Sequence, residues 1–155
     1  MQLRVPFKDL VYIAIQLILF ILFFYPIYSK EDPVPGIAWK TTSVLTIVAG
    51  GIVLFFALVQ LNKNLTPFPS PKDSGELVQS GLYKYIRHPI YSGILLLAIG
   101  ISLNSCSSWK LVITSLLAIL FYFKSQYEED LLCKKYIEYK KYKKSTGRFI
   151  PLMRL

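Results

Sequence analysis

The 155-residue chain is poor in metal ligands and in acidic side chains. It contains one histidine, His88, and two cysteines, Cys106 and Cys133. A structural zinc site takes four Cys or His ligands and a disulfide scaffold takes several cysteine pairs, so both are excluded and we expect no bound metal. No Gly-x-Gly-x-x-Gly motif follows a strand pattern, which excludes a soluble dinucleotide-binding fold. Nine acidic residues stand against 18 Lys and Arg.

Long uncharged segments dominate the amino-terminal half. Residues Val11–Tyr28 and Thr41–Leu61 carry no charge, and each matches the ~20 residues that cross a ~30 Å hydrocarbon layer. Two shorter apolar segments, Pro89–Leu103 and Leu111–Phe123, are joined by a small polar loop and predict a tight helical hairpin that is tilted or lies in a thinned bilayer. Gly50-Gly51, within the second segment, predicts close helix packing. We expect an all-α integral membrane protein with about four transmembrane helices.

The positions of the basic residues predict the orientation. With four spans, fifteen Lys and Arg lie on the side of both termini and of the Asn62–His88 loop, against only Lys30, Lys40 and Lys110 on the other. This bias places both termini and that loop in the cytoplasm. The basic residues between Lys134 and Arg154 follow a membrane span directly, so we assign them to anionic lipid headgroups rather than to nucleic acid.

The carboxyl-terminal segment predicts a cytoplasmic amphipathic helix that either continues from the fourth span or is bent away from it. Glu128, Glu129 and Asp130 open it and lysines close it, which suits a helix dipole. Its tyrosines, spaced by three, would form one stripe or an aromatic belt at the lipid interface; they are Tyr136, Tyr139 and Tyr142. Before the hairpin, the proline-rich segment Asn64–Ser80 predicts a loop with fixed bends.

Two charged clusters carry the candidate chemistry. Arg87 and His88 stand before Pro89, at the mouth of the third span, where charge is costly unless it is used or paired. Because the hairpin is tight, we expect them to lie close to Glu128 and Glu129. The four side chains would form a salt bridge that holds the hairpin shut, or would bind a zwitterionic ligand. The alternative for the first cluster is an arginine that reaches lipid phosphates beside a structural histidine.

Three ordered blocks of sequence resemble the isoprenylcysteine carboxyl methyltransferase family and its phospholipid methyltransferase relatives. The blocks are Gly81-x-Tyr83-x-x-x-Arg87-His88-Pro89-x-Tyr91-x-Gly93, Glu128-Glu129-x-x-Leu132, and Glu138-Tyr139-x-x-Tyr142-x-x-x-Thr146-x-Arg148-x-Ile150-Pro151. The resemblance covers roughly residues 65 to 151. It implies a membrane-embedded transferase that uses S-adenosylmethionine and releases S-adenosylhomocysteine.

The resemblance also implies which residues form the site. The residues expected to line the cofactor site are Leu77, Val78, Gly81, Tyr83, Arg87, His88, Pro89, Tyr91, Glu128 and Glu129. Of these, the expected catalytic residues are Arg87, His88 and Glu128. Three further residues, Tyr139, Tyr142 and Arg148, are expected to bind the acceptor. The single membrane domain, 1–155, would then divide into an acceptor or lipid side at 1–62 and a cofactor-binding half at 63–155.

The methyl acceptor is expected to be a lipophilic small molecule or lipidated group, with no obligate protein partner. A carboxylate such as a prenylcysteine-like group needs no general base, which suits a chain with few candidate bases. A phospholipid or amine acceptor is the alternative, and it would need His88 or a glutamate as a proton sink. The Gly-x-Gly pair of some phospholipid methyltransferases has no counterpart. A nicotinamide-dependent membrane reductase and a noncatalytic membrane module are the remaining alternatives.

Overall fold

The computed structural model of the protein describes residues 6–26, 36–72 and 74–152, and these residues form an all-helical fold. The helices are α1 (Phe7–Phe24), α2 (Ile37–Leu61), α3 (Pro89–Asn104), α4 (Ser108–Lys135) and α5 (Tyr139–Ser145), with 3-10 turns η1 (Asn62–Asn64) and η2 (Gly81–Lys84). No strand occurs in these ranges, where a single β-bridge joins Ile86 to Gly147. The predicted fold class is confirmed.

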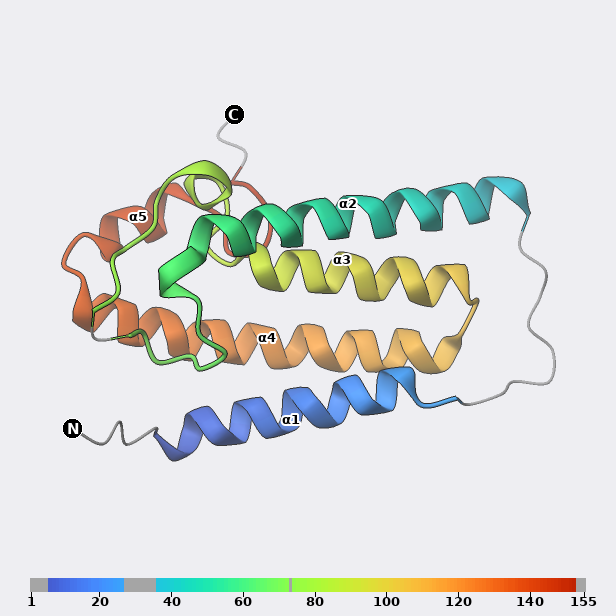
Figure 1. Ribbon diagram of the computed structural model, residues 1–155, viewed down its shortest axis with the longest axis horizontal. Coiled ribbons are helices and arrows are strands. Elements are labelled where there is room, and N and C mark those ends of the chain that lie inside the picture. Colours follow the sequence, from blue (N-terminus) through green and yellow to red (C-terminus); the bar gives the residue numbers. More distant parts are fainter. Residues whose placement is uncertain (1–5, 27–35, 73, 153–155) are drawn as a thin grey trace.

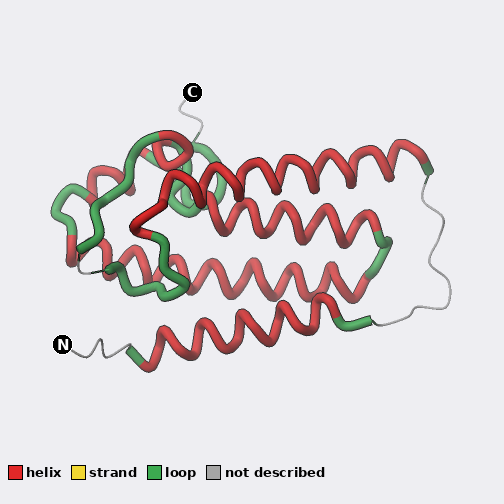
Figure 2. The backbone as a smooth tube through the Cα atoms, viewed as in Figure 1, coloured by secondary structure: helices red, strands yellow, loops and turns green. Residues whose placement is uncertain are grey.

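The four long helices lie side by side and alternate in direction (Figure 1). Their spatial order is α2, α3, α4, α1, so that the last helix in space is the first in sequence. The loop between α2 and α3, and helix α5, gather at one end of this bundle, where α1 begins and α4 ends (Figure 2). Any site built from these segments therefore lies at that end.

Three helices are long and apolar enough to cross a membrane. They are α1, α2 and α4, with 18, 25 and 28 residues. Helix α3 has 16 residues, and at about 1.5 Å per residue it is about 24 Å long, less than the ~30 Å hydrocarbon layer. Large apolar side chains on the outside of α1 and α2 have no protein neighbours to cover them, as expected for lipid-facing helices; examples are Ile21, Phe24, Leu45 and Phe55.

Helix α4 extends well beyond the apolar segment Leu111–Phe123. The charged helix expected after Phe123, either continuing from the fourth span or bent away from it, continues the span without a break to Lys135. The segment 124–135 contains neither Gly nor Pro, and Lys124, Ser125 and Glu129 are buried against neighbouring elements, so helical hydrogen bonding continues. The acidic residues therefore lie inside α4 rather than at a helix start.

The predicted tyrosine stripe is wrong in part. Tyr136 caps α4 in an extended conformation, with φ −120° and ψ 117°, so it belongs to the link before α5. Tyr139 and Tyr142 alone share α5, which ends at Ser145. The loop expected at Asn64–Ser80 is confirmed, because no helix lies between η1 and η2 in its described residues. Tyr28, Arg4, Lys30 and Arg154 lie outside the described residues.

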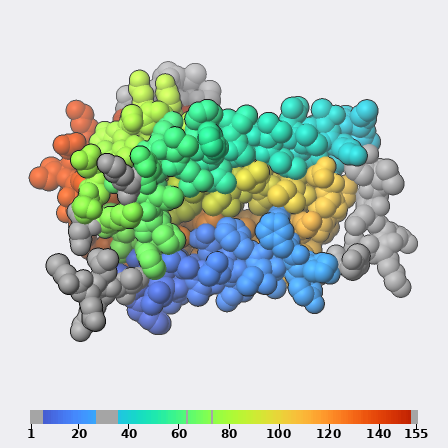
Figure 3. Space-filling view, in the orientation of Figure 1, coloured from blue at the N-terminus to red at the C-terminus, as the bar shows by residue number. Residues whose placement is uncertain are grey.

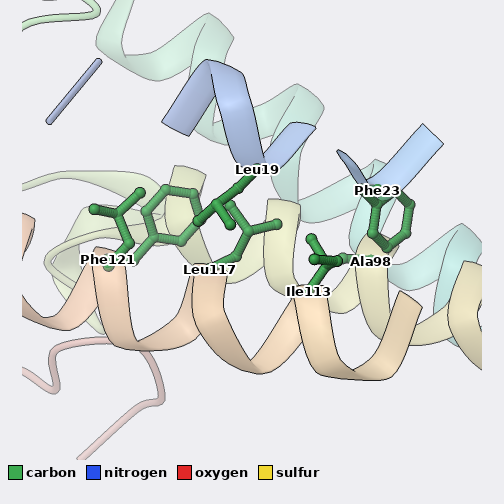
Figure 4. Close-up of a cluster of buried hydrophobic side chains, with 7 residues drawn as sticks. Leu19, Phe23, Ala98, Ile113, Leu117 and Phe121 are labelled. Atoms are coloured by element: carbon green, nitrogen blue, oxygen red, sulfur yellow. The ribbon is translucent and has the colours of Figure 1, made fainter. Parts of the chain in front are cut away.

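The apolar core joins α1, α3 and α4. Leu19 and Phe23 of α1 pack against Leu117 and other residues of α4 and α3, in the cluster of Figure 4; the remaining buried members are Ala98, Ile113, Leu120 and Phe121. Indole donors add cross-helix hydrogen bonds: Trp109 Nε1 donates to the Leu22 carbonyl at 2.8 Å and Trp39 Nε1 to the Leu103 carbonyl at 2.8 Å. Such bonds help to hold membrane helices together, because the hydrophobic effect does not drive apolar helices to associate within lipid.

Glycines bring the backbones of α2 and α3 into contact. A methyl group at Gly50 would lie 2.7 Å from the Leu97 nitrogen, and one at Gly93 would lie 2.8 Å from the Leu54 nitrogen. Gly51 faces open space, with nothing within 4 Å of its added Cβ. The close packing predicted for Gly50-Gly51 is therefore confirmed for the first glycine and wrong for the second.

The two neighbouring glycines offer a matched test. Gly50→Leu forces α2 and α3 apart, and we expect overpacking to cost about 1–3 kcal/mol. Gly51→Leu adds the same side chain toward open space and is expected to leave stability unchanged or slightly higher, because Gly is a poor helix former. Thermal unfolding of both purified variants in detergent measures this. Equal shifts of the two midpoints would contradict the packing described above.

Candidate functional site

A cavity of about 370 Å³ lies at the loop-rich end of the bundle. Small-molecule sites usually measure ~300–1,000 Å³, so the volume suits one compact ligand. Nine of the predicted site residues line it: Leu77, Val78, Tyr83, Arg87, His88, Tyr91, Glu128, Tyr139 and Tyr142. The wall is completed by the middle of α1, the end of α2 and the proline-rich loop, with Gln16, Leu61, Thr66 and Phe68 among the contributing residues.

The start of α3 is tied to the carboxyl-terminal segment by backbone hydrogen bonds. Arg87 N donates to the Gly147 carbonyl at 2.8 Å and His88 N to the Arg148 carbonyl at 3.1 Å, while Gly147 N donates to the Tyr85 carbonyl at 3.1 Å. Pro89 occupies the first helical turn, where its missing N–H costs nothing. Together these bonds hold the Arg87-His88 pair at the mouth of α3.

Glu129 is the buried anion of the site, with no exposed surface. Its carboxylate lies 2.9 Å from Arg87 Nε, 2.9 Å from Lys143 Nζ and 3.1 Å from Arg148 Nη2. His88 Nε2 is 3.3 Å away, within ion-pair distance but not aligned for a hydrogen bond. Burying an unpaired carboxylate is costly, and several cations with hydrogen bonds offset that cost. Glu129 therefore fastens α3, α4 and the carboxyl-terminal segment together, behind the cavity wall.

Glu128, one residue earlier, faces the cavity, whereas Glu129 does not. Its side chain is 27% exposed, and Oε2 accepts a hydrogen bond from the Tyr91 hydroxyl at 3.0 Å. His88 Nδ1 lies 3.6 Å from the same oxygen, and its ring stacks on Tyr91 with centroids 5.4 Å apart. Glu128 is thus the carboxylate that a bound ligand meets.

Three buried tyrosines supply phenol groups near the cavity. Burial raises the pKa of Tyr142 to about 12, and it raises the pKa values of Tyr83 and Tyr139 further above the ordinary range. All three therefore keep their protons at neutral pH. Tyr142 donates to the Tyr83 carbonyl and Tyr83 to the Ala57 carbonyl at 3.4 Å, whereas the buried Tyr139 hydroxyl has no partner among the described residues.

Four predicted site residues do not line the cavity. Glu129 and Arg148 bind each other, with Arg148 Nε 3.2 Å from the carboxylate. Pro89 is buried at the helix start. Gly81 has φ +58°, a conformation that favours glycine, and a side chain there would collide with Gln60. These residues shape the site without facing it.

Sequence reasoning missed Lys124 and Gln16, which meet on the cavity wall. Lys124 Nζ donates to Gln16 Oε1 at 2.7 Å and to the Pro67 carbonyl at 3.2 Å. The available signal was spacing, because Lys124 lies one helical turn before Glu128. Nothing in the sequence places α1 beside α4, so Gln16 had no such signal. The buried Asp9 was also missed; it accepts from Ser70 N at 3.1 Å and so anchors the proline-rich loop.

The fold and the cavity define a helical membrane protein with a polar site at one end of its bundle. A family model described as phospholipid methyltransferase matches residues 39–139, and the chain belongs to that family, as the resemblance predicted. Two curated rice proteins, from Oryza sativa subsp. indica and subsp. japonica, are similar to it; each is named "Probable protein-S-isoprenylcysteine O-methyltransferase". Each is 24% identical over 114 residues, and the match covers 71% of this chain and 60% of the relative.

Removing the buried anion tests how the site is held together. Glu129→Gln leaves Arg87, Lys143 and Arg148 without a charged partner, and breaking such a buried network costs about 3–5 kcal/mol. Asp130→Asn removes the adjacent but exposed carboxylate and is expected to change stability little. Thermal unfolding of the two purified variants decides the matter. The role given to Glu129 is wrong if both unfold at the wild-type temperature.

Proposed function

We propose that the protein is an integral membrane methyltransferase that transfers a methyl group from S-adenosylmethionine to a lipophilic acceptor. A carboxylate such as a prenylcysteine-like group is the acceptor that we favour. The observation that carries the proposal is the cavity in which the family-motif residues His88, Tyr91, Glu128 and Tyr139 converge. The chain spans about 60% of the length of the rice relatives, which are named as probable O-methyltransferases of protein-S-isoprenylcysteine.

The residues on the cavity wall suit the chemical groups of the donor. Glu128 presents a carboxylate for an ammonium group or a ribose diol, and the unpartnered Tyr139 hydroxyl presents a donor. Arg87 lines the cavity while its Nε and Nη1 bind Glu129 and backbone carbonyls, which leaves Nη2 for a carboxylate. Leu77 and Val78 add apolar wall. Bound there, S-adenosylmethionine would supply a methyl group activated by a positively charged sulfur.

The protein's part in the reaction is alignment and exclusion of water. Two charged reactants that become neutral react best in a site of low polarity, and no general base is needed when the nucleophile is a carboxylate. Glu129, Arg148 and Lys143 act as positioning residues, because they hold the wall that carries Arg87 and His88 without facing the cavity. Tyr142 fixes that wall through its bond to the Tyr83 carbonyl.

The outer surface supports an acceptor with an apolar chain. Atoms of α3 and α4 are visible between α1 and α2 in the space-filling view (Figure 3), and α1 and α2 share few contacts. Ile90 and Ile94 of α3 add apolar side chains to the cavity wall. We propose that the acceptor enters sideways from the lipid along this strip, with the cavity end of the bundle in the cytoplasm, where the charge bias places it.

An amine acceptor is the second candidate, because the matching family model is described as phospholipid methyltransferase. Methylating an amine releases a proton, and a nearby base must accept it. His88, between Glu128 and Glu129, is positioned for this role. The nature of the acceptor therefore decides whether His88 serves in positioning or in proton transfer.

Cofactor binding tests the proposed site. We expect the purified protein to bind S-adenosylmethionine and not a reduced nicotinamide, and we expect Arg87→Ala and Glu128→Ala to weaken that binding at least about tenfold, because each removes a charge-assisted hydrogen bond. Asp130→Ala, an exposed carboxylate on the same helix, is the control. Isothermal titration gives the affinities. Wild-type affinity in both site variants would remove the proposed site.

The Tyr139 hydroxyl allows a test that separates binding from folding. Because this buried hydroxyl has no partner in the described residues, Tyr139→Phe is expected to leave the unfolding temperature unchanged or to raise it. The same variant is expected to bind S-adenosylmethionine more weakly, since it loses a donor in the cavity. An unchanged affinity would show that the hydroxyl does not contact the cofactor.

A further inference from the structure

One cation on the cavity wall, Lys124, has a different environment from the three cations around Glu129. Lys124 lies on α4, one turn before Glu128, with 3% of its surface exposed, and it lines the cavity. Its ammonium sits 5.6 Å from the centre of the Tyr91 ring. Tyr91 in turn stacks on Phe121, with ring centroids 4.7 Å apart. Lys124 therefore occupies the more apolar part of the wall, deeper in the bundle than Glu128.

The partners of Lys124 are neutral. They are the Gln16 amide oxygen at 2.7 Å and the Pro67 carbonyl at 3.2 Å, and no described carboxylate lies within ion-pair distance of it. Arg87, Lys143 and Arg148, by contrast, all pair with Glu129. An ammonium has three N–H donors, so the two acceptors leave one. The carboxylates of Glu128 and Asp9 act on the ammonium only from beyond ion-pair distance. A lysine is rarely buried without a direct anionic partner, because the desolvated charge is costly.

We propose that Lys124 binds the anionic group of the methyl acceptor and so selects acids over amines. This inference rests on the proposed function, and it names the acceptor class by residue. Glu128 and Lys124 then present opposite charges one turn apart on the same wall: Glu128 toward the donor, Lys124 toward the acceptor. Because Lys124 also donates a hydrogen bond to Gln16 of α1, the acceptor's anion would lie between α4, in the carboxyl-terminal half of the chain, and α1, in the amino-terminal half.

The charges change during the reaction in a way that suits this arrangement. A carboxylate oxygen of the acceptor forms a bond to the methyl carbon, the carbon–sulfur bond breaks, and its electron pair stays on sulfur. The products are a neutral thioether and a neutral methyl ester, and no proton moves. Lys124 then faces an ester without charge, which it binds less tightly than the acid. A protonated amine in the same position would be repelled by the ammonium.

If Lys124 had only a structural role, it would tie α4 to α1 and to the proline-rich loop. Four substitutions distinguish this role from binding of the acceptor's anion. Lys124→Met removes the charge, and Lys124→Arg keeps it. Gln16→Met removes the main structural partner of Lys124 while the ammonium remains. Lys134→Met removes an exposed cation from the same helix, outside the cavity wall, and serves as the control.

The experiment measures selectivity in the full-length protein saturated with S-adenosylhomocysteine. The probes are N-acetyl-S-farnesylcysteine and its carboxamide, which differ only in charge at the acceptor group. We expect the wild type, Lys124→Arg, Gln16→Met and Lys134→Met to bind the acid at least about tenfold more tightly than the amide, the size expected for one charge-assisted hydrogen bond. Lys124→Met is expected to bind both probes equally.

Three outcomes would overturn the inference: no acid preference in the wild type, a preference retained in Lys124→Met, or its loss in Gln16→Met to the same extent as in Lys124→Met. Affinity for S-adenosylmethionine is measured on the same purified proteins before S-adenosylhomocysteine is added, and it is expected to be unchanged in Lys124→Met. If the wild type fails to bind S-adenosylmethionine, the proposed function fails as well. If it binds the donor but shows no acid preference, only the role of Lys124 is wrong.

Discussion

A single buried carboxylate holds the functional end of this protein together. Glu129 has no exposed surface and lies within 3.1 Å of side-chain nitrogens from Arg87, Lys143 and Arg148. These cations come from three separate segments: the residues before α3, helix α5, and the carboxyl-terminal segment. The ion pairs act with the backbone bonds between residues 85–88 and 147–148. The cavity exists because these segments converge on one anion.

Glu128 and Glu129 have different roles because they point in different directions from helix α4. Successive residues on an α-helix point about 100° apart, so when Glu129 faces the cations, Glu128 is turned to the cavity. Lys124 lies one turn earlier on nearly the same side as Glu128, where residues four apart are neighbours. Helix α4 is thus both the central packing element of the bundle and the wall that carries charges of both signs to a ligand.

Part of this arrangement could be predicted from the sequence. Uncharged segments of membrane-spanning length predict the long helices, and a short loop between two apolar segments predicts that Arg87 and His88 lie near Glu128 and Glu129. The family resemblance identifies nine of the residues on the cavity wall. These predictions depend only on local spacing and on antiparallel neighbours.

The rest depends on packing that no local pattern encodes. Large apolar residues occur on both the lipid-facing and the protein-facing sides of α1 and α2, so the position of α1 beside α4, and with it the role of Gln16, could not be assigned from the sequence. Which of two neighbouring glutamates is buried depends on the rotation of α4 about its axis. Whether the segment after Phe123 continues α4 or bends away from it could not be predicted, because its charges suggested a water-facing segment, whereas Lys124 and Glu129 are buried by their partners.

The central claim is that this end of the bundle encloses a methyl donor. An experimentally determined structure of the protein with S-adenosylhomocysteine, in lipid nanodiscs, tests it most directly. The account predicts ligand density in the cavity, with polar atoms of the ligand within hydrogen-bond distance of Glu128 and the Tyr139 hydroxyl. Ligand density elsewhere, or an unchanged empty cavity at saturating ligand, would contradict it.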